Sequence, residues 1–121
     1  MIDNKLVVEE KFHDHWAIQT DIESIDVITM NEAVTAPEMR YIIKTLGDIN
    51  EKKILDVGCG LGEASVYFAL KGAQVIATDL SQQMLEATKR LAEKYKVSLL
   101  TIKADSQNFL ATDYYKQFDI I

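Results

Sequence analysis

Glycines and aspartates with regular placement are the residues of this sequence best suited to chemistry. Three glycines lie in the segment LDVGCGLG at residues 55–62, directly after a short apolar run. Glycine permits a sharp turn from strand to helix and a close approach of the backbone to a ligand. Asp79 ends a second apolar run, and its carboxylate could accept hydrogen bonds from both hydroxyls of a ribose. Asp105 follows a third run, so we expect it to line the same cleft.

The segments that must position these residues alternate between apolar strands and amphipathic helices. One helix is expected over 63–71, and another begins after a cap at Ser81. A helix or loop is expected over 109–116. Strands are predicted at 53–57, 74–78, 98–104 and, as an opening only, 118–121. This alternation predicts an α/β fold with a parallel sheet, which binds ligands beyond the carboxyl ends of its strands.

Residues 1–50 read as a helical extension or lid that precedes a sheet domain over 51–121. A helix is predicted over 5–18, whereas 21–34 fits a strand, a helical turn or a loop. Thr35 and Glu38 have the spacing of a capping box, although Pro37 allows the cap to lie one residue later. This helix should end at Gly47.

Composition narrows the classes of protein. The chain has 121 residues, a net charge of -6 and one cysteine, so we expect one domain without disulfides in a reducing, cytoplasmic setting. The acidic balance disfavours a surface that tracks nucleic acid backbones. No apolar stretch is long enough to span a membrane. His13 and His15 are two apart and cannot share a metal on one helix face, so no metal site is expected.

The motifs LDVGCGLG, VIATDLS, IKADSQNF and FDII follow one another between residues 53 and 121. In this order they resemble the first four motifs of class I S-adenosylmethionine-dependent methyltransferases. The resemblance implies a Rossmann-like parallel sheet flanked by helices, of which this chain would contain the first four of seven strands. It also implies S-adenosylmethionine as cofactor, S-adenosylhomocysteine as product and transfer of the sulfonium methyl group to an acceptor.

The resemblance assigns the glycine loop to the methionine end of the cofactor. Gly58 and Gly60 would pass closest to the methionine moiety, and Asp56 would lie near its amino group. Cys59 belongs to the same cofactor-binding loop, as a small buried spacer rather than a nucleophile.

The later motifs would bind the nucleoside. By the same resemblance Asp79 would hold the ribose hydroxyls and Leu80 would pack on the adenine. Asp105 would accept a hydrogen bond from the adenine amino group, and the backbone N–H of Ser106 would bond a ring nitrogen. Asp119 aligns with the acidic start of the fourth motif, where its side chain could face away from the methyl group.

Two other functions stay open. An NAD-dependent oxidoreductase would need a third glycine where this chain has Glu63. A cofactor-binding module without catalysis is the other alternative, and the short chain makes it a serious competitor. No general base is identifiable, and the acceptor is of unknown class, with a small molecule favoured.

The remaining expectations concern surfaces. Phe12 and Trp16 are four residues apart, a spacing that fits core packing or a helix that covers the cofactor cleft. A sheet order of 3-2-1-4 would leave the fourth strand as an apolar edge, so we expect self-association through it.

Overall fold

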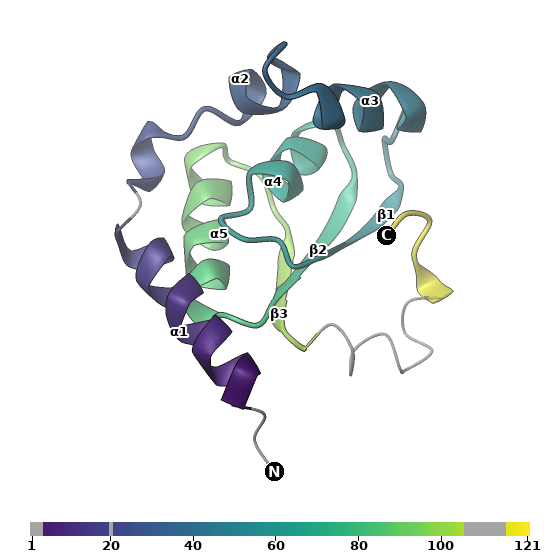
Figure 1. Cartoon of the computed structure of the whole chain (residues 1–121). Coiled ribbons are helices and arrows are strands. Elements are labelled where there is room, and N and C mark those ends of the chain that lie inside the picture. The colour runs from purple at the N-terminus through teal and green to yellow at the C-terminus, as the bar shows by residue number, and fades with distance from the viewer. Residues whose placement is uncertain (1–3, 20, 106–115) are drawn as a thin grey trace.

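The computed structural model describes residues 4–19, 21–105 and 116–121. Its N-terminal part is helical, and its remaining helices alternate with strands (Figure 1). The elements are α1 (Asn4–Gln19), η1 (Ile22–Ser24), α2 (Val27–Glu32), α3 (Pro37–Leu46), β1 (Lys53–Val57), α4 (Glu63–Leu70), β2 (Gln74–Asp79), α5 (Gln82–Lys94) and β3 (Leu100–Lys103). No helix among the described residues is long and apolar enough to cross a membrane.

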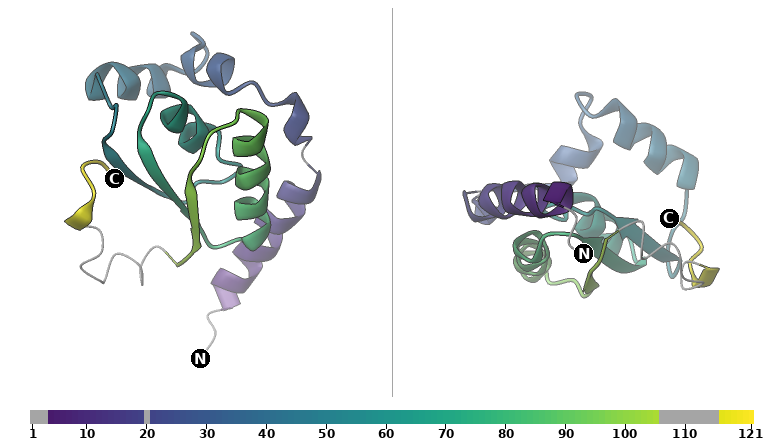
Figure 2. Two further views of the ribbon diagram at one scale, coloured as in Figure 1. Left: turned by 180° about the vertical axis from the view of Figure 1, so that it is seen from behind. Right: turned by 60° about the horizontal axis from the view of Figure 1, so that its bottom comes forward.

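The sheet is parallel, with the order β1-β2-β3. Val75 packs against α4 residues and Ala77 packs against Leu85 of α5. Because residues two apart on a strand point to the same face, both helices cover one face of the sheet. Figures 1 and 2 show α4 and α5 on the same side of the sheet. The predicted Rossmann-like α/β fold is confirmed in this arrangement.

The predicted fourth strand is present only as a single parallel bridge between Ile54 and Ile120. The amide of Leu55 donates to the carbonyl of Ile120 at 3.0 Å. The bridge lies beside β1, so the predicted order 3-2-1-4 is correct, but the segment forms no strand of its own among the described residues.

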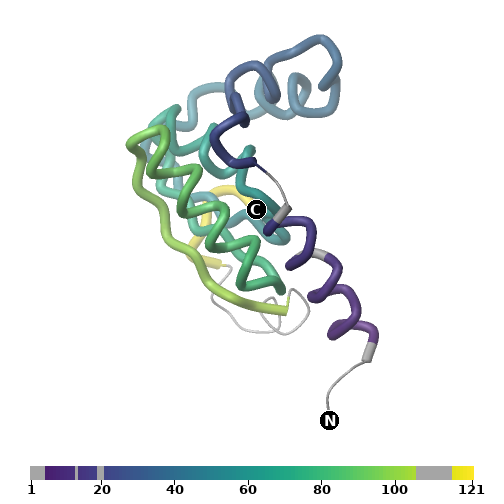
Figure 3. The backbone as a smooth tube through the Cα atoms, turned by 90° about the vertical axis from the view of Figure 1, so that its left-hand side faces the viewer, coloured from purple at the N-terminus to yellow at the C-terminus, as the bar shows by residue number. Residues whose placement is uncertain are grey.

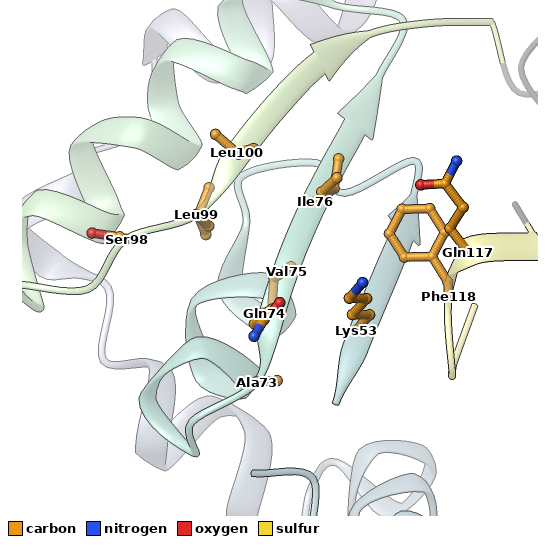
Figure 4. Close-up of a pocket in the computed structure, with 10 residues that line it drawn as sticks. All are labelled: Lys53, Ala73, Gln74, Val75, Ile76, Ser98, Leu99, Leu100, Gln117 and Phe118. Carbon is orange, nitrogen blue, oxygen red and sulfur yellow. The ribbon is translucent and has the colours of Figure 1, made fainter. Parts of the chain in front are cut away.

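The other face of the sheet carries an open hollow of about 380 Å³. Figure 4 shows Ile76 and Leu100 on neighbouring strands, with Phe118 next to β1. Leu100 is 65% exposed. This face therefore presents apolar side chains that the described residues do not cover.

The N-terminal segment shares its core with the sheet domain. Ala17, Ile22 and Val27 belong to one buried cluster with Met84 and Leu91 of α5. Figures 1 and 3 show α1 running alongside α5, far from α3. The segment 21–34, left open by the sequence, is helical in two short pieces.

Side chains cap the starts of α2 and α5, whereas none caps α3 or α4. The side chains of Asp26 and Ser81 accept hydrogen bonds from backbone amides of α2 and α5, the latter as predicted. The capping box at Thr35 does not form: the cap residue of α3 is Ala36, one residue later as Pro37 allowed, and no side chain caps it. Pro37 at the first helical position removes one of the amides that a cap would serve. Gly47 ends α3 as expected.

Candidate functional site

A cleft of about 460 Å³ lies where β2 and β3 end and the loop after β1 begins. The sequence predicted that a ligand would bind at this edge of the sheet. The described residues that line the cleft are Leu6, Glu9, Trp16, Gly58, Gly60, Asp79, Leu80, Ala104 and Asp105. Five of the predicted cofactor residues therefore come together here, from three separate segments of the chain.

Asp79 is the most strongly positioned of them. It is only 4% exposed, and each carboxylate oxygen accepts one backbone N–H. Gly60 N–H donates to Oδ2 and Ser81 N–H donates to Oδ1, both at 2.9 Å. These two bonds join the glycine loop to the end of β2 and hold the carboxylate in a fixed orientation beside the cleft.

Backbone hydrogen bonds join the glycine loop to the neighbouring strand, β2. The amides of Gly58 and Cys59 both donate to the carbonyl of Thr78, at 2.9 and 2.8 Å. With the Gly60 amide held by Asp79, these three amides are already paired within the protein. None of these three amides is therefore left to donate to a ligand.

Gly58 and Gly60 are nevertheless suited to a ligand. Both have positive φ, at 73° and 60°, and an added Cβ at either position would meet nothing within 4 Å. Because both glycines line the cleft, that empty space belongs to the cleft itself. A larger residue would fill it.

Gly62 has a different role. A Cβ at this position would lie 2.6 Å from Cγ2 and Oγ1 of Thr88 on α5. The Thr88 hydroxyl also donates to the Gly60 carbonyl at 3.1 Å. Gly62 thus allows α4 to begin close against α5, and the sequence alone did not separate this packing role from the cleft role of the other two glycines.

Asp56 does not appear among the residues that line the cleft. Its carboxylate accepts a 2.6 Å hydrogen bond from the Ser65 hydroxyl. Burial raises the pKa of Asp56, the Ser65 bond opposes this, and the negative charge of Asp79 raises the pKa further. In the described part of the chain neither Asp56 nor Asp79 forms an ion pair. A cation bound nearby would lower the pKa of Asp56, because an opposite charge favours the ionised carboxylate.

Cys59 points away from the cleft. It is buried with Ala77 and Leu85, and its Sγ lies 3.6 Å from Oγ1 of Thr88. Burial raises the pKa of the Cys59 thiol to about 12, so the reactive thiolate is absent at neutral pH. Its side chain acts as a packing group, in keeping with a spacer role.

The remaining predicted positions fall in different places. Leu80 and Asp105 line the cleft, whereas Ser106 lies outside the described residues. Asp119 lies at the opposite, amino end of β1, where its Oδ2 accepts the Lys53 amide at 2.8 Å. Its side chain therefore faces away from the cleft.

Three residues of α1 complete the cleft wall, and two of them had no predicted role. Leu6, Glu9 and Trp16 follow the spacing i, i+3, i+10, which places them on one face of a helix. That periodicity was visible in the sequence. For Phe12 and Trp16 the sequence left open core packing or a helix over the cofactor cleft, and the structure places Trp16 at the cleft.

Comparison with known proteins identifies the domain. A family model described as a methyltransferase domain matches residues 54–121, more than half of the chain. The chain belongs to the methyltransferase domain family. The resemblance to class I S-adenosylmethionine-dependent methyltransferases is confirmed by this match.

Two curated relatives are also named as methyltransferases. A protein of Geobacillus sp. (strain WCH70) named as a methyltransferase is 37% identical over 95 residues, covering 76% of this chain and 37% of the relative. A ubiquinone biosynthesis O-methyltransferase of Bordetella bronchiseptica is 32% identical over 91 residues, covering 74% of this chain and 36% of the relative. This chain thus spans little more than a third of the length of these relatives.

Solved structures support the fold. Magnesium protoporphyrin IX methyltransferase from Synechocystis PCC 6803, solved with bound SAH, aligns over 85% of this chain and 52% of its own with a TM-score of 0.59 and 20% identity. Phosphoethanolamine N-methyltransferase 1 of Haemonchus contortus aligns over 84% of this chain and 22% of its own with a TM-score of 0.58 and 18% identity. At this identity the likeness concerns the fold.

Proposed function

We propose that this chain is the cofactor-binding part of an S-adenosylmethionine-dependent methyltransferase that transfers the sulfonium methyl group to a small-molecule acceptor. The observation that carries the proposal is the geometry of Asp79. A carboxylate has about four acceptor sites, and the amides of Gly60 and Ser81 use two of them. The other two suit the vicinal hydroxyls of one ribose.

The charge of the cleft supports a cationic ligand. Among the described lining residues three are acidic, Glu9, Asp79 and Asp105, and none is basic. Such a lining repels the pyrophosphate of NAD and attracts the sulfonium and ammonium groups of S-adenosylmethionine. The charge balance therefore favours the methyltransferase over the oxidoreductase.

The glycine loop supports the same ligand. The empty space over Gly58 and Gly60 would receive the methionine moiety, and Asp56 would stabilise its ammonium group, directly or through water. When bound, the cofactor supplies a methyl group on a good leaving group. The protein then mainly has to align the acceptor with the methyl group and exclude water. A general base and the residues that bind the acceptor are not assigned.

Helix α1 serves as a lid in this proposal, within an N-terminal extension over residues 1–50. Trp16 is the only tryptophan of the chain, it lines the cleft, and it is half exposed. In this proposal its indole would lie over the bound cation. Titration with S-adenosylhomocysteine should therefore change tryptophan fluorescence, and an unchanged signal at saturating ligand would remove the lid from the proposal.

The acceptor, the location and the assembly are further parts of the proposal. A small-molecule acceptor is supported by the ubiquinone biosynthesis O-methyltransferases among the relatives and by the net charge of -6. A cytoplasmic location is supported by the single cysteine. Self-association through the edge at the fourth segment is supported by the exposed apolar side chain of Ile121, and light scattering over a range of concentrations tests it.

Calorimetry with S-adenosylmethionine, S-adenosylhomocysteine and NAD tests the cofactor. We expect the two sulfur compounds to bind the chain, NAD not to bind, and Asp79→Asn to abolish or strongly weaken binding. Asp48→Asn is the matched control, because Asp48 is an exposed aspartate outside the cleft lining. Equal affinity of the Asp79→Asn and wild-type proteins, or preference for NAD, would reject the proposal.

A turnover assay on the same samples separates an enzyme from a binding module. Release of S-adenosylhomocysteine in the presence of small phenolic or quinol acceptors is the expected result for the methyltransferase. Binding of S-adenosylmethionine without release of S-adenosylhomocysteine, with every acceptor tested, would favour the non-catalytic module.

A further inference from the structure

Two polar contacts of helix α1 lie next to Asp79, the proposed ribose-binding carboxylate. The hydroxyl of Ser81, two residues after Asp79, donates to Oδ1 of Asp14. The Lys103 ammonium, on the β3 residue that pairs with Asp79, contacts Oε1 of Glu10 at 2.7 Å. Glu10 and Asp14 are four residues apart and therefore share one helix face.

The contact at Ser81 is the more constrained of the two. Ser81 is fully buried, and its Oγ accepts the Met84 amide at 3.1 Å as the cap of α5. The hydroxyl hydrogen goes to Asp14, so this side chain joins α1 to α5, while the Ser81 amide bonds Asp79 at the end of β2. The Lys103–Glu10 pair is half exposed on the lysine side, and such surface pairs contribute little.

A continuous chain of hydrogen bonds then leads into the cleft. Asp14 accepts from the Ser81 hydroxyl, the Ser81 amide donates to Oδ1 of Asp79, and Oδ2 of Asp79 accepts the Gly60 amide. Without Asp14 the buried hydroxyl would lose its acceptor, and residue 81 would have to shift to find another. A shift of Ser81 moves the amide that orients Asp79.

From this chain we infer that Asp14 is a positioning residue for the cofactor site: through Ser81 it orients the Asp79 carboxylate and couples docking of α1 to binding of the nucleoside. The inference rests on the proposed function, because it assumes that Asp79 holds the ribose. It also requires reciprocity: if docking of α1 strengthens ligand binding, the ligand must strengthen docking of α1.

Calorimetry of S-adenosylhomocysteine on variants of the full chain tests the affinity. Asp14→Ala should weaken binding about ten-fold, the order expected for one charge-assisted hydrogen bond. Asp14→Asn, which keeps an acceptor oxygen, should recover part of the loss. Lys11→Ala is the matched control, an exposed residue of the same helix, and should bind like the wild type.

A double-mutant cycle tests the route. If Asp14 acts through Asp79, the effect of Asp14→Ala should largely disappear in an Asp79→Asn background, measured at ligand concentrations high enough to detect the weaker binding. An undiminished effect there would overturn the route through Asp79. Wild-type affinity of Asp14→Ala would overturn the inference as a whole, whereas failure of the wild type to bind would overturn the proposed function instead.

Hydrogen exchange of α1 amides gives a readout that a merely structural contact would not move. The ligand should slow exchange in α1 of the wild type and should do so much less in Asp14→Ala. Equal protection by the ligand in both proteins would contradict the coupling.

Discussion

Alanine at two neighbouring glycines of one loop should have opposite consequences. Gly60 and Gly62 both have positive φ, at 60° and 88°, so alanine at either carries a strain of about 1–2 kcal/mol. At position 60 the new methyl group would project into empty cleft space. At position 62 it would lie 2.6 Å from Oγ1 and Cγ2 of Thr88.

The magnitudes follow from these surroundings. Gly62→Ala should lower the free energy of unfolding by about 2–5 kcal/mol, the strain plus about 1–3 kcal/mol for overpacking. Gly60→Ala should lower it by only about 1–2 kcal/mol. Gly60→Ala should, however, weaken binding of S-adenosylhomocysteine about ten-fold or more, because the added methyl group would overlap the ligand.

Urea unfolding and calorimetry on the same samples measure both quantities. Thr88→Ala should restore part of the stability of Gly62→Ala, because it removes the two atoms at 2.6 Å but leaves Thr88 Cβ at 2.9 Å. This double variant is the decisive sample if Gly62→Ala alone does not fold. Wild-type affinity in Gly60→Ala, or equal stability of the two single variants, would refute the division of roles.

Three further predictions concern residues around the site. Burial raises the pKa of Asp56 above its ordinary value of 3.8, so the ligand-free protein should lose stability as pH rises from 3.8 through that raised pKa. Asp56→Asn should remove this loss of stability, measured by urea unfolding at a series of pH values, and it should also weaken S-adenosylhomocysteine binding. An unchanged pH dependence of stability in Asp56→Asn would contradict this prediction. Tyr67→Phe should lower the free energy of unfolding by about 1 kcal/mol, because it deletes a 2.7 Å hydrogen bond to the half-exposed Glu32, and calorimetry should find ligand affinity unchanged. Asp119→Ala should likewise lower stability by about 1 kcal/mol, through the bond to the Lys53 amide, and a change in ligand affinity would contradict its position away from the cleft.

Local patterns predicted the elements that end at the site. The runs predicted as strands at 53–57 and 74–78 form β1 and β2, the latter with Asp79 added, because each is a short apolar run bounded by glycine or aspartate. The Ser81 cap and the Gly47 stop were also correct, because each depends on a few adjacent residues. The third strand is shorter than predicted, since its ends depend on pairing with β2 rather than on its own residues.

The sequence by itself determined the α/β fold, the glycine loop and the position of Asp79 at the end of a strand, because these follow from short-range periodicity and residue type. The tertiary structure alone decided which glycine packs against Thr88 and which residues of α1 line the cleft. The physical reason is distance along the chain. Asp14 and Ser81 are 67 residues apart, and no local pattern reports that two such residues share a hydrogen bond.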